Sequence, residues 1–473
     1  MARLKRMTAQ GERKGMADKV QGQLTEGPIL KVLTKLALPI MASSLLATAY
    51  NITDMAWIGM LGAKAVAGVG VGGMYVWLSQ GLASLARMGG QVNVAQALGR
   101  GDRVQAGKFA AAALQMVVFF GIVFGAVCLI FADPLIGFFG IEDAQTLQYA
   151  KDYLPITCGL IVFSYVNITL TGLFTAQGDS ATPLLANMVG LLINMVLDPV
   201  LILGMGPAPR MEAAGAAVAT VGAQMVVTGV FALKIFCSGR RQNVLRSTPL
   251  AGRFQKRYYT SVFKIGWPTA LQGSIYCMIS MVLTRMVAAF GPGAVATQRV
   301  GGQIESVSWN TADGFAAALN AFVGQNFGAG KMDRIRKGYR ISFATIAVWG
   351  IGMTLLFVLF PAQISQVFFH EADVLPVAER YMVIVGFSEA FMCVELMAIG
   401  AISGFGKTKL CSAISIILTG LRIPLALLLG RTGLGLEGIW WALTITSMMK
   451  GISLHVTFLR VLRRNYKSVN NML

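Results

Sequence analysis

The amino-acid sequence predicts an all-α membrane protein with twelve transmembrane helices in two six-helix lobes. The first observation is composition: 55% of the 473 residues are hydrophobic and only 13% are charged. The mean hydropathy of +0.64 lies far outside the range of soluble globular chains. The second observation is a series of about twelve apolar runs between Lys35 and Leu462, each near the roughly 20 residues that cross a ~30 Å hydrocarbon core.

The third observation is a long internal repeat. Pro39 lies in Leu-Pro-Ile-Met, and Pro268 lies 229 residues later in Trp-Pro-Thr-Ala. Each copy then holds six helices, and an even number returns the chain to its starting side of the membrane. The two lobes are therefore expected to run in the same direction, related by a pseudo-twofold axis along the membrane normal. The same spacing aligns residues 62–67 with 291–296, Gln96 with Gln325, Gly101 with Gly330 and Lys108 with Lys337.

The repeat and the connecting segments predict five parts of the chain. The stretch before Gly27 is basic and polar and lacks the apolar core and cleavage site of a secretory signal, and Met16 is an alternative start. The parts are a cytoplasmic tail over 1–27, a first lobe over 28–236, a cytoplasmic linker over 237–262, a second lobe over 263–462 and a cytoplasmic tail over 463–473.

Positive charge is concentrated at every second connection between the apolar runs. By the positive-inside rule, this placement predicts cytoplasmic termini and a multi-pass protein of the cell inner membrane. Anionic lipid and topology explain the net charge of +19, so nucleic-acid binding is not expected. The basic segments are residues 100–103, 234–257, 331–340 and 460–467.

Several chemistries are disfavoured by residue usage. The six cysteines show no CxxC spacing, and the chain has only two histidines, His370 and His455. The glycine-rich stretch over 68–73 lacks the strand context and lysine of a phosphate-binding loop. We therefore expect no enzyme activity, no cofactor and no ATP-driven step, and we expect a monomer in the lipid bilayer.

Two carboxylates in apolar helices of the first lobe predict an ion-coupling site. A carboxylate near mid-membrane costs roughly 2.5 to 3.5 kcal/mol on insertion scales, which favours a functional role. Asp54 and Asp198 each lie about one and a half turns before the outer end of an outward-running helix, so they share a depth. Asn194 is one turn below Asp198, and Thr220 reaches a similar level on the sixth helix.

This group of oxygen atoms suits a hard monovalent cation such as Na⁺, or a proton carried by the two carboxylates. The alternative is that Asp198 only pairs or caps internally ahead of Pro199. The repeat places Leu283 and Ala426 at the positions equivalent to the two aspartates, and neither side chain can ligate an ion. The coupling site is therefore expected in the first lobe alone.

The second lobe carries its own ionisable side chains. Glu305, Trp309 and Asp313 recur at intervals of four residues and form one helical stripe, on which Trp309 could stack against an aromatic cation. Glu389 and Glu395 are six residues apart, roughly 120° around a helix, so only one is expected to face a substrate cavity. The alternative for these acids is internal pairing with an arginine: Arg285, Arg299 or Arg422.

Pro39 is expected to kink the first helix. It lies fifteen residues before Asp54 in a run that is otherwise helical, where proline removes one backbone hydrogen bond. A bend at this point could accompany a change in the protonation of Asp54. The alternative is that membrane helices simply tolerate the proline.

Three motifs, in this order and spacing, resemble the MATE (multidrug and toxic compound extrusion) exporters, most closely the bacterial DinF-like branch. They are Tyr50 to Met55 followed by Gly59 to Gly62, Asn194 to Pro199, and Val323 to Gly330. The similarity covers almost the whole chain from Gly27 onward. Tyr276 stands where some other branches carry a glutamate, and Met392 where some carry an aspartate.

The resemblance implies proton- or sodium-driven efflux of bulky, amphipathic and often cationic compounds. It implies the same ion ligands, Asp54, Asn194, Asp198 and Thr220, with the Ala216 carbonyl as an added ligand, and it directs attention to Tyr276 in the substrate cavity. We therefore expect a secondary antiporter that works by alternating access. The alternative is a lipid-linked precursor or polysaccharide flippase of the same superfamily, which would need an arginine-lined cavity.

Overall fold

The computed structural model describes residues 24–205, 209–238, 243–247, 255–369 and 374–470, and within these ranges the chain is helical and contains no strand. Residues 1–23 of the predicted N-terminal tail over 1–27, and His370, lie outside the described residues. The chain divides into two compact units. The first unit contains Ala42–Trp267, and the second contains Thr25–Met41 together with the residues from Pro268 onward.

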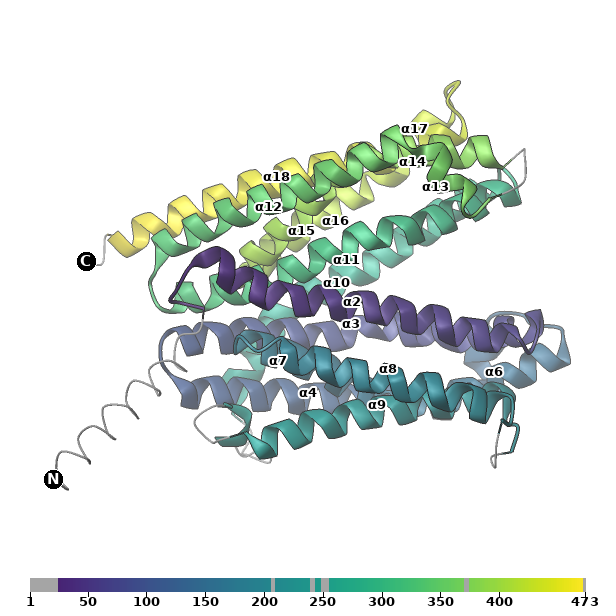
Figure 1. Cartoon of the computed structure of the whole chain (residues 1–473), viewed down its shortest axis with the longest axis horizontal. Helices are drawn as coiled ribbons and strands as arrows, with labels where there is room; N and C mark the ends of the chain where they lie inside the picture. Colours follow the sequence, from purple (N-terminus) through teal and green to yellow (C-terminus); the bar gives the residue numbers. More distant parts are fainter. Residues whose placement is uncertain (1–23, 206–208, 239–242, 248–254, 370–373, 471–473) are drawn as a thin grey trace. The chain divides into compact units, whose positions relative to one another are not determined.

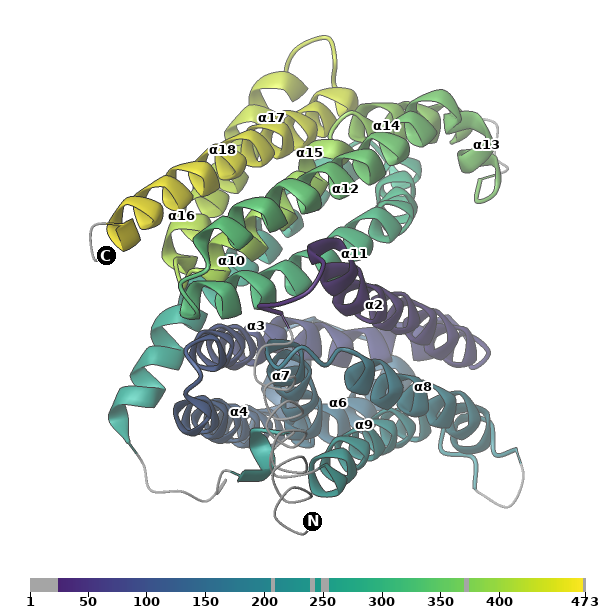
Figure 2. The same ribbon diagram turned by 60° about the vertical axis from the view of Figure 1, so that its left-hand side comes forward.

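The helices of the first unit follow the order that the apolar runs predict (Figure 1). Within this unit α3 packs against α4, α6 and α7, and α8 packs against α9 (Figure 2). The helices are α3 (Ala63–Gly99), α4 (Arg103–Ile130), α5 (Ala132–Gly137), α6 (Ala144–Gly159), α7 (Val162–Ala176), α8 (Ala181–Ile202), α9 (Glu212–Cys237) and the short 3-10 helix η1 (Leu245–Ser247).

The second unit repeats this arrangement. Its α11 packs against α15, and α15 packs against both α12 and α18. The helices are α11 (Pro292–Gly328), α12 (Met332–Leu359), α13 (Pro361–Gln366), α14 (Leu375–Gly386), α15 (Glu389–Gly404), α16 (Thr408–Gly420), α17 (Arg422–Gly430) and α18 (Leu436–Asn470). Since α18 continues to Asn470, the helix extends past the predicted start of the C-terminal tail at residue 463.

The described helices agree with twelve membrane passes. Eight are long and apolar enough to cross a membrane, with residues 408–430 counted as one. Two further passes are bent pairs, α6 with α7 at 45° and α14 with α15 at 46°, at equivalent places in the repeat. The remaining two are α3 and α11, which have 37 residues each and whose most apolar stretches are less apolar than those of the other membrane-spanning helices.

Two helices are shared between the compact units. Helix α2 (Ile29–Gly59) divides after Met41, and α10 (Lys256–Ala288) divides after Trp267. Each division falls beside the proline that the repeat identified, Pro39 in α2 and Pro268 in α10. Proline removes one backbone hydrogen bond, so each helix has a weak point where its packing partners change. The two compact units therefore follow the repeat. Their boundaries differ from the predicted lobe boundaries in the first part of α2 and the first part of α10.

Glycines allow these first parts to pack closely. In the first unit a Cβ on Gly266 of α10 would overlap the Leu85 carbonyl of α3, and a Cβ on Gly89 would overlap the Val262 carbonyl. In the second unit Gly314 of α11 meets the backbone of Met41 on α2 in the same way. Any larger side chain at these glycines would force the backbones apart.

Basic side chains fix the start of α2 on the second unit. Lys331 Nζ donates to the Thr25 carbonyl at 3.1 Å. Arg334 donates from Nη2 to the Glu26 carbonyl at 2.7 Å and from Nη1 to the Gly27 carbonyl at 2.8 Å. All three bonds are accepted by backbone carbonyl oxygens. They therefore hold the segment that leads into α2 independently of the side chains of that segment.

Candidate functional site

The predicted ion-site residues lie together in the first unit. Asp54 is on α2, Asn194 and Asp198 are on α8, and Thr220 is on α9. Asn194 and Asp198 are completely buried, while Asp54 and Thr220 are partly buried. Four positions that are up to 166 residues apart in the sequence therefore meet inside one compact unit.

The polar contacts of this site are few. Asn194 Nδ2 donates to Asp198 Oδ1 at 3.0 Å, which orients one carboxylate oxygen. The Asp54 and Asp198 carboxyls lie close enough to interact electrostatically. The Tyr50 hydroxyl interacts with both carboxyls and approaches Thr220 without reaching hydrogen-bond geometry.

Five oxygen atoms at this site lack a hydrogen-bond partner among the described residues. All five are sealed from solvent, and a buried polar atom left unpaired costs about 1 to 3 kcal/mol. Oxygen atoms from two carboxyls, an amide and two hydroxyls are the ligand types that a hard cation prefers. The atoms are Asp54 Oδ1, Asp198 Oδ2, Asn194 Oδ1, Thr220 Oγ1 and the Tyr50 hydroxyl oxygen.

Apolar packing beside the carboxyls holds the helices in place. A buried cluster includes Ile58 from α2, Ala65 and Val69 from α3, Tyr153 from α6 and Ala216 from α9. Ala216 is completely buried, lies four residues before Thr220 on α9 and belongs to the same apolar cluster as Ile58 and Tyr153. Its role as an ion ligand stays a prediction.

Two tyrosines belong to the site although the sequence did not assign them to it. Tyr50 lies four residues before Asp54 on α2, so helical spacing could have identified it. Tyr153 comes from α6, is 7% exposed, and interacts electrostatically with Asp54, Tyr50 and Asp198. Nothing in the pattern of α6 distinguishes Tyr153 from an ordinary core residue, because its neighbours come from other helices.

The second unit contains a separate group of buried acids. Tyr381 on α14 donates its hydroxyl to Glu305 Oε1 at 2.5 Å. Glu389 on α15 is completely buried, interacts electrostatically with Glu305, and has no hydrogen-bond partner for either carboxyl oxygen among the described residues. Glu305 and Glu389 therefore lie in one interior cluster, as their expected positions on the helices allowed.

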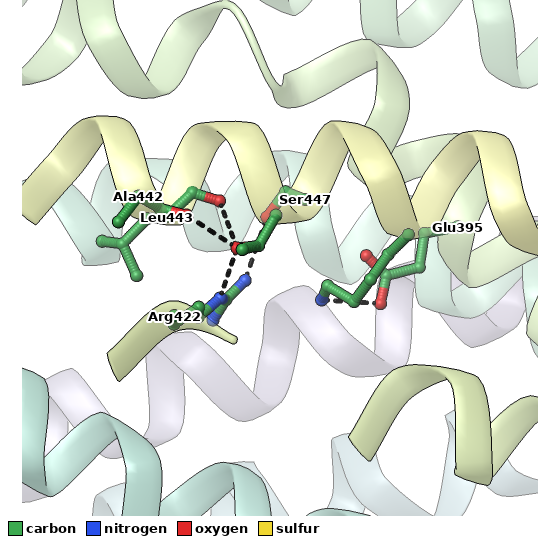
Figure 3. Close-up of polar contacts among 7 residues, drawn as sticks. Glu395, Arg422, Ala442, Leu443 and Ser447 are labelled. Carbon is green, nitrogen blue, oxygen red and sulfur yellow. Dashed lines mark hydrogen bonds and ion pairs between the residues drawn. The ribbon is translucent and has the colours of Figure 1, made fainter. Parts of the chain in front are cut away.

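Glu395 faces a different part of this interior. Its carboxyl forms a 2.8 Å ion pair with Lys450 Nζ of α18, and both side chains are 7% exposed (Figure 3). The predicted internal partners were arginines, so Lys450 is a residue that the sequence analysis missed. A lysine in an otherwise apolar helix was the available signal.

The remaining second-lobe candidates have mixed surroundings. Trp309 is 44% exposed on α11, and Asp313, two turns from Glu305, is partly buried. Tyr276 of α10 is 48% exposed and lies with its ring 5.8 Å from the Arg422 guanidinium. The assignment of these residues, and of Glu305, Glu389 and Glu395, to a substrate cavity stays a prediction.

Known proteins resemble this chain over most of its length. A probable multidrug resistance protein NorM of Thermotoga maritima is 27% identical over 87% of this chain and 88% of its own length. An FAD transporter of Shewanella oneidensis is 24% identical over 93% of this chain and 96% of its own length. A crystal structure of MATE in complex with MaD3S has a TM-score of 0.87 and 20% identity, and the match covers 95% of this chain and 99% of that chain.

The model of the MatE family matches the chain twice, over residues 39–200 and 268–428. The two matches begin 229 residues apart, which confirms the internal repeat. They cover more than half of the chain, and the structural similarity confirms the fold. The chain is therefore a multi-pass membrane transporter and not an enzyme, and it belongs to the MatE family.

Proposed function

We propose that this protein is a secondary active multidrug efflux antiporter that exports amphipathic, often cationic compounds in exchange for H⁺ or Na⁺. The family places it among membrane transporters, and its NorM relatives are named as multidrug resistance proteins. The observation that carries the coupling proposal is the group of five buried oxygen atoms around Asp54 and Asp198 that have no hydrogen-bond partner among the described residues. A cation bound there would satisfy atoms that the protein leaves without partners.

The coupling mechanism uses competition for these oxygens. When Na⁺ enters, the Asp54, Asp198, Asn194 and Thr220 oxygens replace part of its hydration shell. When a proton enters instead, it relieves the repulsion between two neighbouring carboxylates. One site can therefore accept either ion, and its occupancy changes the charge beside α2.

The shared helix α2 supplies a route from ion binding to movement. Asp54 belongs to the first unit, whereas Pro39 lies in the part of α2 that packs with the second unit. A change of charge at Asp54 alters the position that α2 prefers, and the missing hydrogen bond at Pro39 lowers the cost of bending there. The proposed cycle alternates access between the two sides of the membrane.

The orientation of the protein in the membrane is proposed from the placement of its basic residues. The basic linker after Cys237 and the basic segment at the C-terminal end of α18, residues 460–467, are assigned to the cytoplasmic side of the inner membrane. The protein is proposed to act as a monomer in the lipid bilayer, with small-molecule xenobiotics or metabolites as its substrates.

The deciding experiment measures substrate efflux from proteoliposomes under an imposed sodium or proton gradient. Asp54→Asn and Asp198→Asn keep the size of each side chain but remove its charge, so each is expected to reduce gradient-driven efflux to the passive leak rate. Asp152→Asn is the matched control, because Asp152 is a partly buried aspartate of α6 in the same unit whose carboxylate accepts a hydrogen bond from Gln148. Full gradient-driven efflux in both site variants would show that coupling takes place elsewhere.

A further inference from the structure

Arg422 is a buried cation that the coupling proposal does not use. It is the first residue of α17, lies in a helical segment apolar enough to span the membrane, and is 6% exposed. A charged side chain in such a segment is costly, and proteins usually offset the cost with a carboxylate or with function. The groups that contact Arg422 therefore show whether a carboxylate offsets this cost or whether a function explains it.

The guanidinium is held in place by neutral groups. Its Nε donates to Thr446 Oγ1 at 3.0 Å, and its Nη2 donates to Ser447 Oγ at 2.9 Å (Figure 3). Thr446 is itself oriented by bonds to the Ala442 and Leu443 carbonyls of α18. The guanidinium is thus fixed by two neutral hydroxyls, which carry no negative charge to offset its own.

Among the described residues, no carboxylate lies within 4.0 Å of the Arg422 guanidinium. Glu305 attracts it from a longer distance, but one Glu305 oxygen already accepts the bond from Tyr381. Lys450 adds a second positive charge nearby, and Glu395 is engaged by Lys450. The Nη1 amino group of Arg422 makes no hydrogen bond within the described part of the chain and is not sealed from solvent.

The geometry fits an oxyanion. A guanidinium with a free amino group offers planar donors that match a carboxylate or phosphate, and charge-assisted bonds of this kind are about twice as strong as neutral ones. The Tyr276 ring lies beside the guanidinium and is half-exposed, so it presents an aromatic face next to the charge. An anion here would place a negative charge in direct contact with the guanidinium, which no carboxylate of the described residues does.

We propose that Arg422 and Tyr276 form an anion-binding subsite for substrate, so that the transporter accepts amphipathic aromatic compounds that carry a carboxylate or phosphate. This inference rests on the proposed export function and adds a substrate class to it. In the same unit the second carboxyl oxygen of Glu305 and both carboxyl oxygens of Glu389 have no hydrogen-bond partner among the described residues, so this interior can also attract a positive group on the same molecule. Zwitterionic compounds are therefore substrates as well as purely cationic ones.

The test compares two probes that differ only in the anionic group: a rhodamine dye with a free carboxylate, and its methyl ester. Binding of each to the purified full-length protein is measured by fluorescence anisotropy without an ion gradient. The protein is expected to bind the free acid about tenfold more tightly than the ester, the size of one charge-assisted hydrogen bond. Equal affinities in the unsubstituted protein would overturn the subsite without recourse to any variant.

Three variants test whether Arg422 is the source of the preference for the free acid over the ester. Arg422→Gln is expected to bring the affinity ratio of acid to ester close to one, while Arg422→Lys keeps part of it because the charge remains. Arg431→Gln is the matched control, since Arg431 is exposed at the other end of α17, and it should keep the full ratio. Unchanged ester affinity shows that each variant is folded, and a full ratio in Arg422→Gln would contradict the assignment.

The same anion chemistry is found in lipid headgroups, so the titration is repeated with added phosphatidylglycerol or phosphatidylcholine. Persistence of the acid preference in both lipids supports a solute as the occupant. Loss of the preference only with phosphatidylglycerol would assign the subsite to lipid and overturn the substrate proposal. Gradient-driven efflux of the ester is measured separately, because its absence alone would contradict the export function and not the subsite.

Discussion

The ion pair between Glu395 and Lys450 shows how much depends on single buried charges. Both side chains are 7% exposed, and the two charged atoms are 2.8 Å apart. Removing one partner leaves the other charge buried and uncompensated, which costs about 3 to 5 kcal/mol. The pair therefore matters for folding, whatever part Glu395 has in substrate binding.

We expect Lys450→Met to lower the free energy of unfolding by about 3 to 5 kcal/mol, and Glu395→Leu combined with Lys450→Met to regain most of that loss. Thermal unfolding of the purified protein in detergent measures the effect. Lys409→Met, at an exposed lysine of α16, serves as the control and should change little. A double variant no more stable than Lys450→Met would show that the pair itself is not the source of the effect.

At this scale the sequence selected four polar side chains that the fold brings together, and it identified the neighbours of the acids poorly. The role of the four side chains as an ion site stays a prediction. Asp54, Asn194, Asp198 and Thr220 were found because polar atoms in apolar helices are costly and helical spacing gives their depth. Lys450 was missed as the partner of Glu395. The choice between arginine and lysine partners depends on how α15 and α18 rotate against each other, and that is a matter of packing.

At the level of helices, Asp143 shows how one side chain can join two elements. Its carboxylate caps α6 by accepting from the Thr146 backbone N–H at 2.8 Å, and it pairs with Lys64 of α3 at 2.6 Å. The Lys64 bond and the Thr146 bonds lower the pKa of Asp143 to about 2, from an ordinary 3.8. A carboxyl with a lowered pKa stabilises the fold above its ordinary pKa and loses that effect as the pH falls through the lowered value.

We therefore expect Asp143→Ala to lower the melting temperature at neutral pH, with the difference from the unsubstituted protein shrinking as the pH falls from about 4 toward 2. Asp143→Asn should lose less, because asparagine still caps a helix but cannot pair with Lys64. Melting curves across this pH range provide the measurement, with Glu142→Ala as the exposed neighbouring control. A difference that does not depend on pH would rule out the carboxylate charge as its cause.

Helices α2 and α10 show the limit of prediction at this level. The repeat identified Pro39 and Pro268 as equivalent, and both lie inside helices beside the points where the compact units divide. The sequence could not show that the segment before each proline packs with the other unit, because hydrophobic periodicity identifies a buried face without naming its partner.

For the whole molecule, the basic connections predict the side of the membrane on which each loop lies. Cys237 ends α9 at the start of the basic linker and is exposed, whereas the other five cysteines are buried. This cysteine can therefore report the topology directly.

A membrane-impermeant maleimide is expected to label Cys237 in inside-out vesicles and to leave it unlabelled in right-side-out vesicles, because the positive-inside rule places the linker in the cytoplasm. Lys64→Cys in a Cys237→Ser background is the matched control. Lys64 is exposed and lies beside the connection from α2 to α3, which is expected on the outer side of the membrane. This variant should show the reverse pattern. Labelling of Cys237 from the outside would invert the proposed topology.

The sequence by itself determined the membrane class, the duplication and the family, and it predicted the four polar side chains of the proposed ion site. These properties follow from hydropathy, from a repeat spacing of 229 residues and from the cost of polar atoms in lipid, all of which can be read along one chain. Only the tertiary structure placed Tyr153 beside the proposed ion site and paired Glu395 with Lys450. It also left Arg422 without a carboxylate within 4.0 Å in the part of the chain that is described. Each of these depends on which residues of different helices come into contact, and packing decides that.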